Sequence, residues 1–216
     1  SGMLYGGILS FFTEKCAEDK ERRRLEAKHR TGLCRKPEEG GGLEGDRRVE
    51  QIRYLLENGF KDAQKRRIVR SREQRMIHET YIRSSIAKIF QTEWEDNQER
   101  IMRKYGIEKL QQETFVVMPR RSGKTWSMAM FCAVMMVVCS DIEISIFATG
   151  QRTAGKLLKL IEKMLNSLLE FIGADNYKIL QHNQEGILII GPDGTERKCG
   201  CYPGSASVSV FPPVCY

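Results

Sequence analysis

Residues 115–130 read Phe-Val-Val-Met-Pro-Arg-Arg-Ser-Gly-Lys-Thr-Trp-Ser-Met-Ala-Met, and the fold that we predict is organised around this stretch. The apolar run 115–118 predicts a short buried strand, and the apolar residues of 125–138 predict a buried helix. A tight loop, 119–125, joins them. The first N–H groups of a helix have no intrahelical partners and attract an anion. The order strand, loop, helix is therefore typical of a phosphate-binding loop.

Three residues of this loop have the chemistry that a nucleotide phosphate requires. Gly123 lets the backbone approach phosphate oxygens, Lys124 can reach the outer phosphates, and the Thr125 hydroxyl can ligate Mg²⁺. The pattern is a variant of G-x-x-x-x-G-K-[ST], because Met118 stands at the position of the first glycine. A solvated turn that caps a core helix is the alternative interpretation. The residues expected to bind phosphate are Pro119, Arg120, Arg121, Ser122, Gly123, Lys124 and Thr125.

The nonamer at 118–126, Met-Pro-Arg-Arg-Ser-Gly-Lys-Thr-Trp, resembles the Walker A segment of the herpesvirus terminase large subunit. That segment has the form Val-Pro-Arg-Arg-His-Gly-Lys-Thr-Trp, so Met118 replaces Val and Ser122 replaces His. The resemblance covers about residues 111–208, and no match is found for residues 1 to about 100. The further segments that resemble the family are the strand and turn at 144–150, the hairpin turn at 191–195 and the segment 201–208.

This resemblance implies the ATP-binding portion of a viral terminase large subunit, an ATPase that drives duplex DNA into capsids in the host cell nucleus. It implies ATP and Mg²⁺ as cofactors. The implied partners are double-stranded DNA, the capsid portal protein, other terminase subunits and further copies of the intact chain. Catalysis would involve Lys124 and Arg120, with Arg121 as the alternative to Arg120 in stabilising charge on the γ-phosphate. Gln111 or Gln112 would contact adenine, although two glutamines equally suit a polar turn before a strand.

Composition and charge agree with this class of protein without specifying it. The chain of 216 residues is 41% hydrophobic and 29% charged, which predicts one soluble domain with a charged extension. The longest apolar stretch, 128–139, is far shorter than the ~20 residues that span a bilayer, so we expect no membrane segment. The net charge of +7 favours a polyanionic partner.

The cysteines predict core thiols rather than a disulfide framework or a zinc site. Their number, seven, is odd and their spacing is irregular. Cys132 and Cys139 lie in the apolar helix, and we place Cys199 and Cys201 in a strand. No second cysteine pair or histidine accompanies them at the spacing of zinc ligands.

Three regions follow from the pattern along the chain. Residues 1–46 form a flexible segment that is charged and rich in glycine, and residues 47–110 form a basic helical region. The resemblance implies that residues 111–216 are a partial P-loop ATPase domain. Within the helical region, the run 65–72 is interpreted as a solvated helix face, with a phosphate-contacting patch or a nuclear localisation segment as alternatives. His78 is interpreted as a surface or interhelical residue and not as a metal ligand.

The fold class predicted for the C-terminal region is α/β, with a partial parallel sheet of the P-loop type and a β-hairpin. Residues 143–148 predict a strand, 152–171 an amphipathic helix, and 187–190 with 197–202 a hairpin whose turn contains Asp193 and Gly194. Strands alternating with helices imply parallel strands joined by right-handed crossovers. A charged, all-helical N-terminal region precedes this sheet in the predicted architecture.

The acidic strand that holds Mg²⁺ in P-loop ATPases is not found in the sequence. Asp193 is the nearest candidate, and it belongs to the hairpin turn because Pro192 and Gly194 flank it. We therefore expect an incomplete fragment, whose ending would reflect an exon boundary, a truncation or an engineered end, and which would bind nucleotide weakly without hydrolysing it. A helicase-like ATPase and a non-enzymatic fragment that binds a partner protein are the alternative functions.

Overall fold

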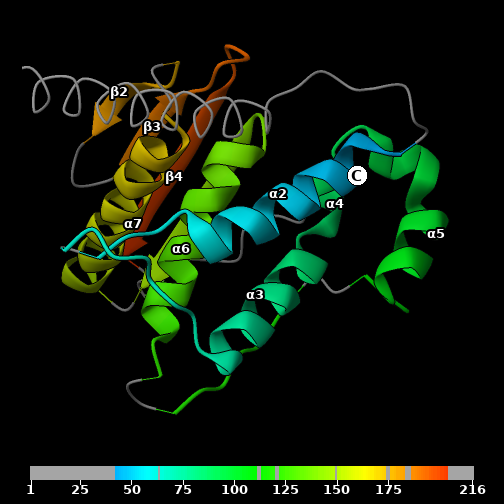
Figure 1. The fold of residues 1–216 in the computed structure, drawn as a ribbon, viewed down its shortest axis with the longest axis horizontal. Helices are drawn as coiled ribbons and strands as arrows, with labels where there is room; N and C mark the ends of the chain where they lie inside the picture. Colours follow the sequence, from blue (N-terminus) through cyan, green and yellow to red (C-terminus); the bar gives the residue numbers. More distant parts are fainter. Residues whose placement is uncertain are drawn as a thin grey trace, which may run out of the picture. The chain divides into compact units, whose positions relative to one another are not determined.

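The computed structural model describes residues 42–62, 64–110, 113–119, 122–148, 150–173, 176–182 and 186–203. Contacts divide the chain into residues 1–40 and 41–216, and all of the described residues belong to the second unit. Figure 1 shows its elements, which are α2 (Glu44–Asn58), α3 (Arg72–Ser84), α4 (Ile86–Phe90), α5 (Glu93–Tyr105), α6 (Lys124–Val138), β1 (Ile142–Ala148), α7 (Gln151–Ile172), β2 (Lys178–His182), β3 (Gly186–Ile190) and β4 (Glu196–Pro203).

The four strands form one open mixed sheet in the order β1-β4-β3-β2. β1 pairs in parallel with β4, from Ile142 opposite Arg197 to Ala148 opposite Pro203. β3 is antiparallel to both β4 and β2, so β2, β3 and β4 form a meander that brings β4 back beside β1. The mixed α/β class is therefore confirmed. The hairpin predicted at 187–190 and 197–202 is observed as β3 and β4. The parallel partner of β1 is β4, whereas the predicted crossover placed it beside a strand at 115–118.

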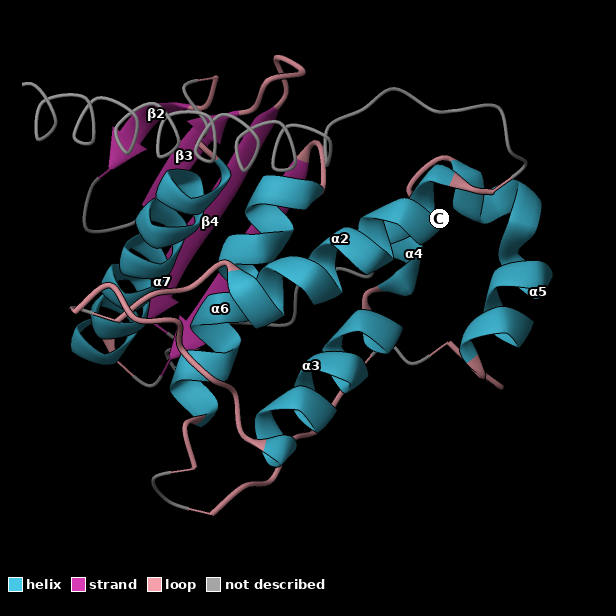
Figure 2. Cartoon of the chain, viewed as in Figure 1, coloured by secondary structure: helices cyan, strands magenta, loops and turns pink. Residues whose placement is uncertain are grey.

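Helix α6 is the centre of the hydrophobic core. Almost every residue of this helix after its first turn is buried, as its apolar sequence predicts for a helix without a polar face. α7 and the sheet pack against it on one side, and α2 and α3 pack against it as well (Figure 2). The predicted helix 125–138 and the core positions of Cys132 and Cys139 are confirmed.

The helices before α6 are shorter than the region assigned to them. α2 to α5 lie within 44–105, but the residues described from Gly59 to Ser71 are irregular apart from one bridge between Lys61 and Arg67. The region is thus not all-helical. None of the helices among the described residues is long and apolar enough to cross a membrane.

The predicted strand at 115–118 is wrong. Residues 113–119 have no regular secondary structure, and the side chains of Phe115 and Val117 are 93% and 80% exposed. A strand needs a partner for its backbone N–H and C=O groups, and this segment pairs with no strand in the described residues. Four apolar residues are also too few to distinguish a buried strand from an exposed loop by pattern alone.

The interpretation of the basic run 65–72 as a solvated helix face is also wrong. Only Arg72 lies in a helix, at the start of α3, and Ser71 is its N-cap. Arg70 is buried, with its guanidinium 2.7 Å from the Glu57 carboxylate. A buried charge requires a partner, and Glu57 on α2 provides it. The run is therefore an irregular connection that is fixed at Arg70.

Candidate functional site

The loop 119–125 leads directly into α6. Gly123 is the N-cap of the helix, with φ of 79° and ψ of 17°, in the left-handed region that glycine adopts at no steric cost. The next two residues, Lys124 and Thr125, are exposed in the first helical turn. The Ser122 hydroxyl donates a hydrogen bond of 2.8 Å to the carbonyl of Pro119. This bond connects the two sides of the loop. Arg120, Arg121, Gln111 and Gln112 lie outside the described residues.

A buried histidine joins α3 to the beginning of α6. The Nε2 atom of His78 lies 2.9 Å from the carbonyl oxygen of Ser127, and its Nδ1 atom lies 2.8 Å from a guanidinium nitrogen of Arg70. Because arginine can only donate, Nδ1 accepts and Nε2 carries the proton. The interhelical interpretation of His78 is confirmed. Ser127 in turn bonds to the carbonyl of Gly123 through its backbone N–H, at 2.9 Å, and through its hydroxyl, at 3.2 Å.

The pKa of His78 is lowered to about 4, mainly by burial and also by the neighbouring Arg70 guanidinium, while the bond to the Ser127 carbonyl acts in the opposite direction. The imidazole is therefore neutral at neutral pH. A proton on Nδ1 would face the N–H groups of Arg70. His78 consequently acts as a fixed connection between two helices, and proton transfer is not its role at neutral pH.

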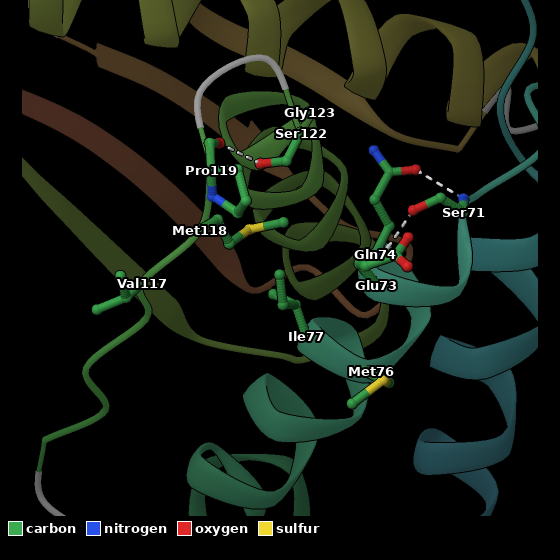
Figure 3. A pocket seen from close by; sticks show the side chains of 10 residues that line it. All are labelled: Ser71, Glu73, Gln74, Met76, Ile77, Val117, Met118, Pro119, Ser122 and Gly123. Atoms are coloured by element: carbon green, nitrogen blue, oxygen red, sulfur yellow. Dashed lines mark hydrogen bonds between the residues drawn. The ribbon is translucent and has the colours of Figure 1, made fainter.

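A pocket of about 760 Å³ lies between the N-terminal end of α3 and the loop. This volume is within the range of pockets that hold small-molecule ligands and cofactors. Figure 3 shows the side chains that line it, which are those of Ser71, Glu73, Gln74, Met76, Ile77, Val117, Met118, Pro119, Ser122 and Gly123. Met118, the residue at the position of the missing glycine, is thus part of the pocket wall.

The polar side of the pocket is formed by the first turn of α3. Ser71 and Gln74 form a capping box, in which the Ser71 hydroxyl accepts from the Gln74 N–H at 3.3 Å and the Gln74 amide oxygen accepts from the Ser71 N–H at 2.9 Å. Glu73 is the only carboxylate that lines the pocket among the described residues. Bonds from its own backbone N–H and from the Ser71 side chain hold the pKa of Glu73 below its ordinary value.

Asp193 lies at the other end of α6 from the loop. It accepts a bond of 2.6 Å from the hydroxyl of Ser140, which follows the C-terminal end of the helix. The 15 residues of α6 separate these ends by about 22 Å. Asp193 also pairs with Arg197 at 2.8 Å and accepts two bonds from Thr195. The hairpin position predicted for Asp193 is confirmed, and this carboxylate is too far from the loop to share a metal ion with Thr125.

The described part of the chain contains no other candidate metal site. No three histidine, cysteine, aspartate or glutamate residues lie close enough together there to hold an ion. Cys199 lies in β4, the strand predicted for it, and is buried. The hydrogen bonds of Asp193 outweigh its partial burial, which by itself would raise the pKa, and hold that pKa well below the ordinary range.

Sequence reasoning missed Gln74 and the pocket itself. The capping box had a readable signal, since Ser71-Arg72-Glu73-Gln74 has the form S/T-x-x-E/Q before a helix. No pattern in the sequence shows that this turn lies against Gly123, which is 49 positions after Gln74. Contact between the two is a consequence of the way α3 packs on α6.

Comparison of the chain with protein-family models gives no match. Comparison with curated protein sequences gives no match either.

Proposed function

We propose that this chain binds the phosphates of ATP, with Mg²⁺, at the loop 119–125, as the ATP-binding portion of a DNA-packaging motor of the terminase type. The observation that carries the proposal is the geometry around Gly123. A glycine in the left-handed conformation stands at the start of a long buried helix, followed by an exposed lysine and threonine, and it borders a pocket large enough for a nucleotide.

Three described residues of the loop have a defined part in this proposal. Gly123 has no side chain of its own to keep a phosphate from its backbone, Lys124 supplies a cation for the outer phosphates, and Thr125 supplies a hydroxyl for Mg²⁺. The packing of His78 on Ser127 fixes the first turn of α6, from which these groups extend. Because the residues before the loop are irregular, phosphate binding depends on the helix side of the loop.

The terminase-type assignment rests on the nonamer at 118–126 and on the arginines within it. Under this proposal Arg120 acts on charge that develops on the γ-phosphate, with Arg121 as the alternative, and duplex DNA is the partner of the motor. Glu73 is the carboxylate that lines the pocket among the described residues, and Asp193 is excluded by its place at the other end of α6. We therefore expect binding of Mg·ATP without sustained hydrolysis.

A titration of the purified chain with Mg·ATP tests the proposal. Trp126 lies in the first turn of α6 and is 38% exposed, so its fluorescence should respond to occupancy of the loop. Lys124→Ala should weaken binding at least ~10-fold, since it removes a charged contact to phosphate. Lys159→Ala is the matched control, because it removes an exposed lysine from α7 and should leave the affinity unchanged.

Equal affinities of the two variants for Mg·ATP would contradict the proposal. Hydrolysis is measured in the same preparations as released phosphate. Sustained hydrolysis by the unaltered chain that is abolished in Lys124→Ala would show that a carboxylate of this chain completes the site, and Glu73→Gln would then identify Glu73 if it abolished turnover as well.

A further inference from the structure

The pocket beside the loop has two chemically different ends. Met76, Ile77, Val117 and Met118 form an apolar end, whereas Ser71, Gln74, Ser122 and Gly123 gather at a polar end next to the start of α6 (Figure 3). A nucleotide bound by its phosphates at the loop would place its anionic part at this polar end. The side chain of Gln74 is the one that extends from α3 across the polar end toward Gly123.

The capping box determines which atom of the Gln74 amide faces the loop. The Oε1 atom is held by the Ser71 N–H at 2.9 Å, so the amide group cannot rotate without losing that bond. Its Nε2 atom lies 2.5 Å from the position that a Cβ atom on Gly123 would occupy. Within the described residues, Nε2 has no hydrogen-bond partner. The Nε2 group of Gln74 is thus an N–H donor without a partner among the described residues, and it lies beside Gly123, the loop residue that has no side chain.

We propose that Gln74 is a phosphate-contacting residue of the nucleotide site, with its Nε2 atom donating to an oxygen of the bound phosphate chain. This inference rests on the proposed function. It makes α3 the second wall of the site, so that the phosphates lie between the start of α6 and the first turn of α3. It also gives a reason for glutamine at this position, because glutamate completes a capping box equally well but has no N–H to donate.

Glu73 determines the form in which the phosphate should be tested. Its carboxylate lines the same pocket and repels a bare polyphosphate, whereas Mg²⁺ bound to the phosphates reduces that repulsion. The probes are therefore Mg·ATP and Mg·tripolyphosphate, measured by titration calorimetry with the whole chain. Tripolyphosphate has the anionic part of the ligand without the base and the ribose, and so it isolates the contact that we assign to Gln74.

Gln74→Glu is the decisive variant. It keeps the oxygen that accepts from Ser71, and so it keeps the helix cap, but it replaces the donor by a negatively charged acceptor. We expect it to weaken the binding of Mg·ATP and of Mg·tripolyphosphate by the same factor, about 10-fold or more. Gln98→Glu makes the same change of charge at an exposed position on α5 and should change neither affinity by more than about twofold.

The outcomes separate this inference from the proposed function. If the unaltered chain binds both probes, Lys124→Ala weakens them and Gln74→Glu does not, the assignment of Gln74 is overturned and the proposed function stands. If the unaltered chain binds neither probe, both fail. A loss of Mg·ATP affinity alone would place Gln74 on the base or ribose and would overturn the phosphate contact.

A second pair of variants covers a failure of Gln74→Glu to fold. Gln74→Ala and Ser71→Ala both break the capping box, but only the first removes the donor. A larger loss of Mg·tripolyphosphate affinity in Gln74→Ala than in Ser71→Ala supports the contact. Equal losses would mean that the residue acts through the helix cap, and the proposal would be wrong.

Discussion

Gly123 is a residue at which backbone conformation and tertiary contact both exclude a side chain. Its φ is 79°, and a Cβ atom would lie 2.5 Å from the Gln74 amide nitrogen. We expect Gly123→Ala to lower the free energy of unfolding by about 1 to 2 kcal/mol, the cost of the left-handed conformation for alanine, with a further loss if Gln74 cannot move. Urea-induced unfolding followed by circular dichroism measures this change.

Gly155 is the matched control for this substitution. It lies inside α7, and a Cβ atom there would meet nothing within 4 Å. Alanine loses less conformational entropy in a helix than glycine, so Gly155→Ala should raise the free energy of unfolding by up to about 1 kcal/mol. A destabilisation of similar size in both variants would contradict the special position of Gly123.

His78 should make folding stability depend on pH between about 6.5 and 4. Its pKa falls from 6.5 in the unfolded chain to about 4 in the folded one, so in this range the unfolded chain binds more protons. The contribution of His78 is complete above pH 6.5 and decreases as the pH falls toward 4, with a total on the order of 3 kcal/mol. The measurement is the free energy of unfolding against pH for the unaltered chain and for His78→Gln.

The difference between the two chains isolates His78 from the carboxylates that also titrate at acidic pH. This difference should decrease from pH 6.5 to pH 4. An NMR titration gives an independent control, because the imidazole resonance that disappears in His78→Gln should not titrate above pH 5. Titration of that resonance near pH 6.5 would show that His78 is accessible to water and would contradict the connection between α3 and α6.

At the scale of elements, Arg197 joins the β3–β4 hairpin to the C-terminal end of α6. The side chain is 3% exposed, donates to the carbonyl of Cys139 at 2.9 Å and pairs with Asp193 at 2.8 Å. Its guanidinium also lies 5.7 Å from the ring centre of Tyr177. These contacts connect the hairpin to the C-terminal end of α6 and to Tyr177, which precedes β2.

We expect Arg197→Met to lower the free energy of unfolding by about 2 to 3 kcal/mol. This is at the low end for a broken buried pair, because Asp193 is partly exposed and retains its bonds to Ser140 and Thr195. Arg66→Met is the control, since the Arg66 side chain in its pair with Asp62 is 75% exposed and the pair should contribute less than about 1 kcal/mol. Equal unfolding midpoints in urea for the two variants would contradict the role of Arg197.

The segment between α2 and α3 contains both structural and solvent-exposed cations. Arg70 is buried, whereas Lys65, Arg66, Arg67 and Arg72 are exposed, and Arg66 is paired with Asp62. If this segment contacts DNA phosphates, replacing Lys65, Arg67 and Arg72 by glutamine should weaken binding to duplexes of any sequence. It should also flatten the plot of log affinity against log salt concentration by about 2 to 3 units of slope. Fluorescence anisotropy with two unrelated duplexes at several salt concentrations is the measurement.

The control replaces three exposed cations on other helices, which are Lys88, Arg100 and Arg103, and leaves the net charge equal to that of the first variant. A salt slope that is the same in both triple variants would make the segment an ordinary solvated surface. Arg70 must be retained in either variant, because its loss would leave Glu57 without its buried partner.

At the scale of the whole described unit, the sheet has one face covered by α6 and α7, and the described residues provide no helix for the other face (Figure 2). Ile142, Ile144 and Ile146 of β1 pack toward the core, and the alternate residues Glu143, Ser145 and Phe147 point away from it. Phe147 is 55% exposed and lies 5.6 Å, between ring centres, from Tyr202 on β4. Exposed aromatic side chains on the face of a sheet favour association.

We expect the chain to self-associate through this face as its concentration rises. Phe147→Thr removes apolar area at a position where a β-branched residue suits a strand, so it should shift the sedimentation profile toward the monomer. Val69→Thr changes a residue that is 65% exposed in the irregular segment and serves as the control. Equal association of both variants would show that the sheet face is not the surface involved.

The sequence pattern was sufficient to predict helices and strands that bury one continuous face, and also α6, which is buried on all sides. The helices predicted at 125–138 and 152–171 and the strand predicted at 143–148 are observed at 124–138, 151–172 and 142–148. These elements and the turn at Asp193 were predictable because apolar periodicity and turn residues are local properties. The strand predicted at 115–118 failed for the converse reason. Whether four apolar residues form a strand depends on a partner strand, and their own sequence does not specify one.

The sequence by itself determined that Gly123, Lys124 and Thr125 begin a buried helix and that α/β structure follows. Only the tertiary structure decided that β4 pairs with β1, that Arg70 and His78 are buried, and that Gln74 lies against Gly123. The physical reason is the distance along the chain between the residues that interact. Helix formation, capping and turns depend on residues a few positions apart, whereas the pocket is built by packing α3 against α6, whose contacting residues His78 and Ser127 are 49 positions apart in the chain.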